Sequence, residues 1–156
     1  MKLFSDASEY ALRAVVWLAQ RPSQTQKVRE IAAATHAAPG YLVKVLQALA
    51  KADILSAQRG SLGGFTLKRD PATLSVLEVV NAIDPIERMH TCPLGLAQHS
   101  GHLCPMHTRI DDAIVTIENC FGSSTIKELL LACEHSTCSC QALAVEPSCK
   151  SLKQES

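Results

Sequence analysis

The stretch from residue 28 to residue 67 constrains the fold more than any other part of the chain. It has the sequence VREIAAATHAAPGYLVKVLQALAKADILSAQRGSLGGFTL. Two short helical patterns lie on either side of a Pro–Gly break, and two short apolar runs then flank a glycine-rich turn. Helix, turn, second helix and hairpin in this order are typical of a winged helix-turn-helix, which reads DNA. The alternative interpretation is a small α+β domain that binds no nucleic acid.

The charge of the chain is divided unequally between its two halves. The 156 residues have a formal net charge of zero, yet residues 1–69 contain ten Lys and Arg against four acidic residues. The first part therefore carries +6, and residues 70–156 carry −6. A basic half is suited to binding phosphates, and an acidic half indicates that the rest of the chain has a different role.

Several broad classes of protein are disfavoured by the composition. No apolar run approaches the roughly 20 residues that a membrane span needs, and the first residues, MKLFSDASEY, lack the apolar core of a secretory signal. We therefore expect a cytoplasmic protein with no membrane partner. The chain has no glycine-rich nucleotide motif and no evident base and oxyanion arrangement, so we do not expect an enzyme.

Helical and strand spacing predicts a DNA-binding domain over residues 1–84. The first helix is expected to be capped by Asp6, with Glu9 in capping-box spacing, and Pro39 is expected to open the third helix. Two strands around the glycine-rich turn form the expected wing. The expected helices and strands are Ser5–Arg21, Lys27–Thr35, a helix from Pro39, Ile54–Arg59, Phe65–Lys68 and Ser75–Ile83.

The residues expected to contact DNA come from the third helix, the wing and the first helix. The third helix is the candidate for the major groove, and Arg59 at the base of the wing turn is placed to enter a minor groove. Glycines in that turn allow the backbone to approach a phosphate chain. Arg13 lies off the apolar stripe of its helix and is interpreted either as a phosphate contact or as a solvated arginine. The full set is Arg13, Gly40, Tyr41, Lys44, Gln47, Arg59, Ser61, Gly63 and Gly64.

A Cys/His loop over residues 85–104 and a long helix follow. Pro105 is expected to open this helix, which would run to about Phe121 and form, with a last short helix capped by Ser123 or Ser124, the unit 105–133. Its apolar residues recur in nearly heptad spacing, and such a stripe needs a partner. Packing on its own domain and pairing with the same helix of a second copy are both possible, and we favour the homodimer. The stripe consists of Met106, Ile110, Ile114, Ile117 and Phe121.

The cysteines are confined to the second half of the chain. None of the seven precedes Cys92, which indicates metal, cofactor or redox chemistry and not a disulfide scaffold. The tail, residues 134–156, is expected to be poorly ordered because it follows the last periodic helix. The expected fold is therefore mainly α with a small β wing: a winged helix-turn-helix domain plus a long C-terminal dimerisation helix.

Five segments in this order resemble the IscR, NsrR and CymR family of bacterial winged-helix regulators, the Rrf-two family. They are EYALRAVVWLA, PGYLVKVLQALAKADIL, RGSLGGFTL, SVLEVVNAID and CPLGLAQHSGHLCPMH. The resemblance covers about residues 1–133. It implies a dimeric transcription factor, usually a repressor, that binds double-stranded operator DNA and pairs through its long helix. It also implies that many members carry an iron–sulfur cluster beside that helix.

The resemblance extends only in part to the cluster ligands. In cluster-binding relatives three loop cysteines hold the iron; Cys92 and Cys104 match the first and last, but the middle position falls in residues 96–100, which contain no cysteine. His107 matches a ligand of one branch, and Glu9 aligns with an acidic position that in some relatives reaches the cluster from the partner subunit. His99 or His102 could replace the missing ligand. The candidate metal ligands are Cys92, Cys104, His107, His99 and Glu9.

Four interpretations of this loop stay open. The first is a 2Fe–2S cluster with mixed Cys, His or carboxylate ligation, which suits a redox sensor. The second is tetrahedral zinc held by Cys92, His99, Cys104 and His107. The third is direct thiol oxidation of Cys92 and Cys104, and the fourth is a loop that binds nothing. The preferred function is a regulator whose operator binding responds to redox or iron–sulfur status; the alternative is the same fold without a cluster, responding to thiol oxidation, zinc, a small molecule or a protein partner.

Overall fold

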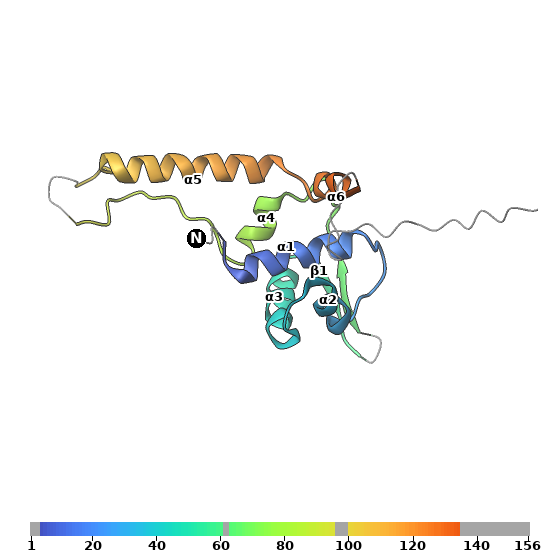
Figure 1. Cartoon of the computed structure of the whole chain (residues 1–156). Coiled ribbons are helices and arrows are strands. Elements are labelled where there is room, and N and C mark those ends of the chain that lie inside the picture. The colour runs from blue at the N-terminus through green and yellow to red at the C-terminus, as the bar shows by residue number, and fades with distance from the viewer. Residues whose placement is uncertain (1–3, 61–62, 96–99, 135–156) are drawn as a thin grey trace, which may run out of the picture.

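The computed structural model describes residues 4–60, 63–95 and 100–134. It is mainly helical with one two-stranded antiparallel sheet, which confirms the expected fold class. Figure 1 shows the long helix α5 on one side of the molecule and the pair α2 and α3 with the wing on the other. The elements are α1 (Asp6–Ala19), α2 (Val28–Thr35), α3 (Pro39–Lys51), β1 (Leu55–Gln58), β2 (Gly64–Leu67), α4 (Val76–Asn81), α5 (Pro105–Ser123) and α6 (Ile126–Glu134).

Helix α1 is the centre of the hydrophobic core. It contacts α2, α3, α4, α6 and β2, so it joins the helix-turn-helix to the C-terminal helices. Its apolar positions recur every three or four residues, and Ala11, Ala14 and Val15 are fully buried. The inner face of α3 closes the same core with Leu42, Val45, Leu46 and Leu49.

Two expected helix caps are wrong, and in each case a neighbouring residue takes the position. Ser5, not Asp6, caps α1, because its hydroxyl accepts the N–H of Ser8 at 3.2 Å. Thr125 caps α6 by accepting the N–H of Glu128 at 3.2 Å. Ser123 and Ser124 are not available for that role, since both hydroxyls donate to the carbonyl of Cys120 at the end of α5.

The wing is held by a third stretch of backbone beside its two strands. Gln26 exchanges two backbone hydrogen bonds of 2.9 Å with Phe65 in β2. A Cβ at Gly64 would lie 2.3 Å from the Gln26 carbonyl oxygen, and a Cβ at Gly63 would lie 2.5 Å from the Gln58 oxygen. Both glycines are therefore required by the close approach of the chain to itself.

The apolar stripe of α5 divides into two adjacent faces. One face packs on the same chain: the Phe121 ring lies 5.1 Å from the ring of Phe4, and Ile114 lines a pocket there. The other face is open, with Met106 57% and Ile110 44% exposed. Only one residue of this 19-residue helix is buried, and it is His107. One face of the stripe thus packs on its own chain, and the adjacent face is left exposed in the structure.

Some expectations concern residues outside the described part of the chain. Ser61, His99 and the whole stretch 135–156, with the expected disorder of the tail, are among them. Among the described residues, no helix is long and apolar enough to cross a membrane.

Candidate functional site

Three potential metal ligands converge where the Cys/His loop meets the start of α5. The Nδ1 atom of His107 lies 3.1 Å from Sγ of Cys104 and 3.5 Å from Sγ of Cys92. All three donor atoms lie within 4.8 Å of one another. Cys104 and His107 are each only 7% exposed, whereas Cys92 is half-buried. The structure therefore brings together three of the five predicted ligands.

The start of α5 explains why Cys104 and His107 meet. Cys104 is the N-cap residue, Pro105 occupies the first helical position, and His107 is the third residue of the helix. Side chains at the N-cap and the third helical position face each other in any capping box. Here a thiol and an imidazole occupy these two positions, so the start of the helix alone brings together two of the three ligands.

The same position alters the acidity of Cys104. The pKa of its thiol is lowered to about 7, first by the backbone N–H of His107 and further by the His107 ring and the Cys92 thiol. A helix N-terminus stabilises an anionic sulfur for this reason. A thiolate is the form that binds metals and reacts with oxidants, so the site provides an activated sulfur near neutral pH.

Cys92 reaches the site from a loop that is fastened to α5 by an ion pair. The guanidinium of Arg88 donates to both carboxylate oxygens of Asp111, from Nε at 2.7 Å and from Nη2 at 2.5 Å. The backbone N–H of Met89 donates to the same carboxylate at 3.0 Å. The sequence reasoning missed this pair, because a contact between residues 23 apart leaves no periodic signal.

The other predicted ligands are not assembled with these three. Glu9 forms an ion pair with Arg13 on α1 and is half exposed. The Nδ1 atom of His102 lies 3.3 Å from the carbonyl oxygen of Ser100, and this histidine is exposed. His99 lies outside the described residues. Within the described ranges, the group of Cys92, Cys104 and His107 is the one cluster of three or more such ligand atoms.

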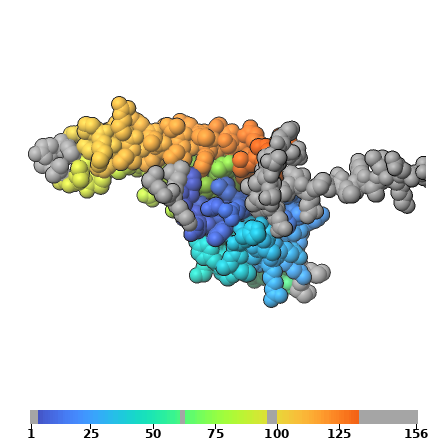
Figure 2. All heavy atoms as spheres, in the orientation of Figure 1, coloured from blue at the N-terminus to red at the C-terminus, as the bar shows by residue number. Residues whose placement is uncertain are grey.

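The second candidate site is the surface formed by α3 and the wing, on the opposite side of the molecule from α5 (Figures 1 and 2). The residues expected to read DNA from α3 are all exposed: Gly40, Tyr41, Lys44 and Gln47. Arg59, directly after β1, is exposed as well. Gly40 has open space where a Cβ would lie.

Several cations on α2, α3 and the wing form no ion pair within the part of the chain that the structure describes. Arg29, Lys44, Lys51 and Arg59 are exposed, and none pairs with another residue in the described ranges. On the α4 and α5 side, by contrast, Arg69 pairs with Glu78 at 3.0 Å and Arg88 pairs with Asp111. These four unpaired cations are thus free to act on an approaching anion.

Arg13 has a structural role that the sequence reasoning did not anticipate. Its Nη1 donates to the carbonyl of Thr35 at 3.2 Å, and its Nη2 pairs with Glu9. It therefore ties α1 to the end of α2, just before the turn of the helix-turn-helix. Its guanidinium also lies 5.9 Å from the ring centre of Tyr10, which contacts Tyr41 edge-on at 6.0 Å.

Comparisons with known proteins agree with this architecture. The model of the Rrf2 family, described as iron-dependent transcriptional regulators, matches residues 4–132. A protein of Aquifex aeolicus (strain VF5), named as an HTH-type transcriptional regulator, is 27% identical over 131 residues, which are 82% of this chain and 91% of that protein.

Solved structures share the fold. T. potens IscR has a TM-score of 0.71 at 20% identity, over 89% of this chain and 93% of its own. CymR of B. subtilis, titled the global cysteine regulator of that organism, has a TM-score of 0.67 at 18% identity, over 83% of this chain and 96% of its own.

Proposed function

The chain belongs to the Rrf2 family of DNA-binding transcriptional regulators, not to a family of enzymes, and we propose that it is a homodimeric repressor controlled through Cys92, Cys104 and His107. In this proposal, operator binding responds to redox or iron–sulfur status at that site. The observation that carries the proposal is the convergence of three ligand atoms within 4.8 Å at the start of α5. A regulator of this kind would act on double-stranded DNA in the cytoplasm.

DNA recognition is assigned to α3 and the wing. Tyr41, Lys44 and Gln47 project from the exposed face of α3, which suits insertion into a major groove. Lys44 and Gln47 have the donors and acceptors for base edges, whereas Arg59 is suited to the negative potential of a narrow minor groove. With so few base-reading side chains, specificity depends also on the spacing between two reading heads.

The second reading head is supplied by a second copy. Met106 and Ile110 form an exposed apolar edge on α5, which the exposed Ala113 and Cys120 continue, and Ile117 borders this edge on the side of the pocket toward Phe4. The spacing of these residues is the heptad pattern of a helix that pairs with another helix. The pairing would fix the distance between the two α3 helices, and hence between two operator half-sites.

The residues at the site fit an iron–sulfur cluster in chemistry. Cysteine thiolates and histidine are both cluster ligands, and the lowered pKa of Cys104 makes its thiolate available. A bound cluster supplies one-electron redox chemistry, with a potential raised by histidine ligation. Cys92, Cys104 and His107 would hold it, and a fourth ligand must come from elsewhere, His99 or the Glu9 of a second copy being the candidates.

A single zinc ion is a second candidate, favoured by the compactness of the site. Ligand sulfur and nitrogen atoms of a tetrahedral site lie about 3.5 Å apart when Zn–S is about 2.3 Å and Zn–N about 2.0 Å. The observed separations from Nδ1 of His107 are 3.5 and 3.1 Å. Direct oxidation of Cys92 and Cys104 to a disulfide is the metal-free version of the same switch.

Purification without oxygen, followed by metal and sulfide analysis and a visible spectrum, distinguishes these candidates. A coloured protein with iron and acid-labile sulfide in equal amounts supports the cluster. Colourless protein with one zinc per chain supports the second candidate. Colourless, metal-free protein whose binding to selected DNA is unaffected by thiol oxidation would remove the site from the proposed function.

A further inference from the structure

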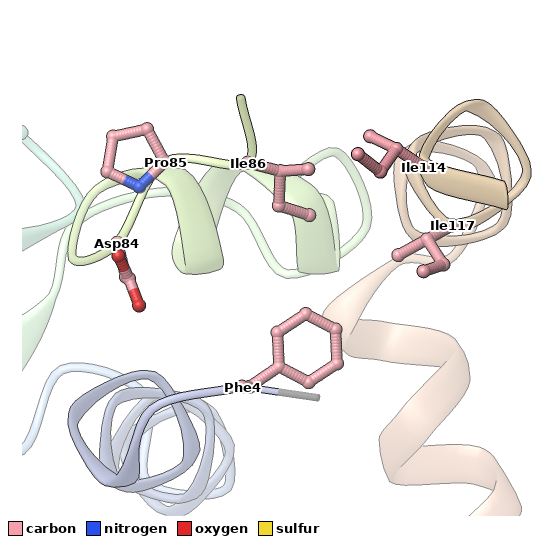
Figure 3. Close-up of a pocket in the computed structure, with 6 residues that line it drawn as sticks. All are labelled: Phe4, Asp84, Pro85, Ile86, Ile114 and Ile117. Carbon is pink, nitrogen blue, oxygen red and sulfur yellow. The ribbon is translucent and has the colours of Figure 1, made fainter. Parts of the chain in front are cut away.

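The loop that carries Cys92 runs along α5 in the opposite direction to the helix (Figure 1). The loop contacts α5 at three successive points along its sequence. Ile86 lies against Ile114 and Ile117 of α5 in an open apolar pocket (Figure 3). Arg88 and Met89 then bind Asp111, and Cys92 finally reaches His107. The order of contacts along the loop is therefore reversed along the helix.

The stretch between Arg88 and Cys92 is longer than the distance along α5 that it has to span. Four residues of extended chain span up to about 13 Å, whereas the four residues of helix from His107 to Asp111 rise about 6 Å. The loop alone would therefore allow Cys92 a range of distances from His107. A fixed point close to Cys92 is needed to keep its sulfur at the site.

Asp111 provides that fixed point. It accepts both Nε–H and Nη2–H of Arg88 and also the backbone N–H of Met89, and its side chain is only 14% exposed. A bidentate pair of this kind fixes direction as well as distance. Glu118, two helical turns further on, adds a longer contact of 3.8 Å to the same guanidinium.

We propose that Arg88 and Asp111 are positioning residues that set the distance of Cys92 from Cys104 and His107, and thereby the affinity of the site for its metal. The proposal rests on the ligand site of the proposed function. Neither residue would be a ligand of the metal; Asp111 acts on Cys92 through Arg88 and through the backbone N–H of Met89. Residues outside the ligand shell commonly change metal affinity by about 10-fold to 100-fold when they are replaced.

The test compares Asp111→Asn with Asp112→Asn in the full-length protein. Asp112 is the neighbouring residue of the same helix. Its ion pair in the described structure is with Arg109, with Asp112 61% and Arg109 87% exposed, and its charge acts on Arg88 less than that of Asp111 or Glu118. Zinc affinity is measured by competition with a chromophoric chelator. Asp111→Asn and Arg88→Ala should raise Kd for zinc at least about 10-fold, while Asp112→Asn and Arg109→Ala should match the wild type.

A second measurement needs no metal. In a glutathione redox buffer, the Cys92 and Cys104 thiols give two electrons and two protons to glutathione disulfide, forming one protein disulfide and two glutathione thiols. The equilibrium constant, read by mass spectrometry of the peptide that contains both cysteines, reports how well the two sulfurs are held together. Asp111→Asn should lower it about 10-fold, which corresponds to about 30 mV in reduction potential, if the pair positions Cys92.

These outcomes separate the two proposals. Wild-type protein that binds neither zinc nor iron contradicts the metal part of the proposed function, and the disulfide equilibrium still tests the positioning role. Equal disulfide constants in wild type, Asp111→Asn and Arg88→Ala would overturn that role. The exchanged pair, Arg88→Asp with Asp111→Arg, should partly recover the zinc affinity and the disulfide equilibrium constant. If the exchanged pair loses as much as the single variants, that result would also count against the positioning role.

Discussion

The Sγ atom of Cys104 lies 3.1 Å from Nδ1 of His107, across the first turn of α5. The contact joins the N-cap residue to the third residue of the helix. It therefore exists only while that first turn is formed, and any ligand that Cys104 and His107 share stabilises the turn. The helix that presents the exposed edge of Met106 and Ile110 thus begins at the candidate metal site.

The first prediction concerns the acidity of Cys104. Because folding lowers the pKa of this thiol to about 7, the thiolate interactions stabilise the fold above the ordinary thiol pKa, and this contribution is lost as the pH falls through about 7. In metal-free protein, the rate of Cys104 alkylation, measured by mass spectrometry, should rise as the pH is raised, with a midpoint near pH 7. His107→Ala should raise the midpoint part of the way, since its backbone N–H remains. A midpoint equal to that of the denatured chain would contradict the assignment.

The second prediction concerns the wing arginine. Arg59→Ala should weaken binding to a selected operator by about 1–3 kcal/mol, because it removes a side chain assigned to the minor groove. The measurement is a fluorescence anisotropy titration at fixed salt concentration. Arg109→Ala, an exposed arginine on α5, is the control and should bind normally. If the two variants bind alike, Arg59 is not part of the interface.

The third prediction separates two glycines with different roles. Gly64→Ala should lower the free energy of unfolding by about 1–3 kcal/mol, because its Cβ would lie 2.3 Å from the Gln26 carbonyl oxygen. Gly40→Ala has no such neighbour and lies in α3, so it should stabilise the fold by up to about 1 kcal/mol. Urea unfolding measures both. Equal stability of Gly64→Ala and wild type would show that the wing backbone can move aside.

The fourth prediction concerns the exposed edge of α5. Ile110→Glu should convert the proposed dimer to a monomer in analytical ultracentrifugation, since a carboxylate would replace an apolar side chain at the proposed contact between two copies. Asn119→Glu adds the same charge at an exposed position that is not on the apolar edge, and should leave the dimer intact. A monomeric wild type would contradict the proposed homodimer, and an Ile110→Glu protein that still dimerises would assign the interface to another surface.

The order of elements follows from local patterns, and the sequence predicts it well. The Pro39 start of α3, the Pro105 start of α5 and the apolar spacing of α1 are all confirmed. Cys92, Cys104 and His107 meet as the resemblance implied, and two of them are linked by helix geometry alone.

Features that depend on contacts between distant residues are not visible in the sequence. The bond from Arg13 to the Thr35 carbonyl and the pair of Arg88 with Asp111 join residues 22 and 23 positions apart, and no periodicity marks them. The same reason applies to the caps: the roles of Ser123 and Ser124 depend on where α5 ends and on a backbone bond from Val76 to Ser124. The spacing of apolar residues also could not show that one face of the α5 stripe packs on the same chain while the other face is exposed.

In the proposed function, the state of Cys92, Cys104 and His107 controls operator binding. The test is an anaerobic titration of an operator that this protein has selected from random double-stranded DNA. The operator is titrated with the protein in three states: as isolated, after metal removal and after thiol oxidation. Kd should change at least about 10-fold between two of these states, which corresponds to about 1.4 kcal/mol, and Cys92→Ser should abolish the change. Equal affinity in all three states would contradict this proposed control.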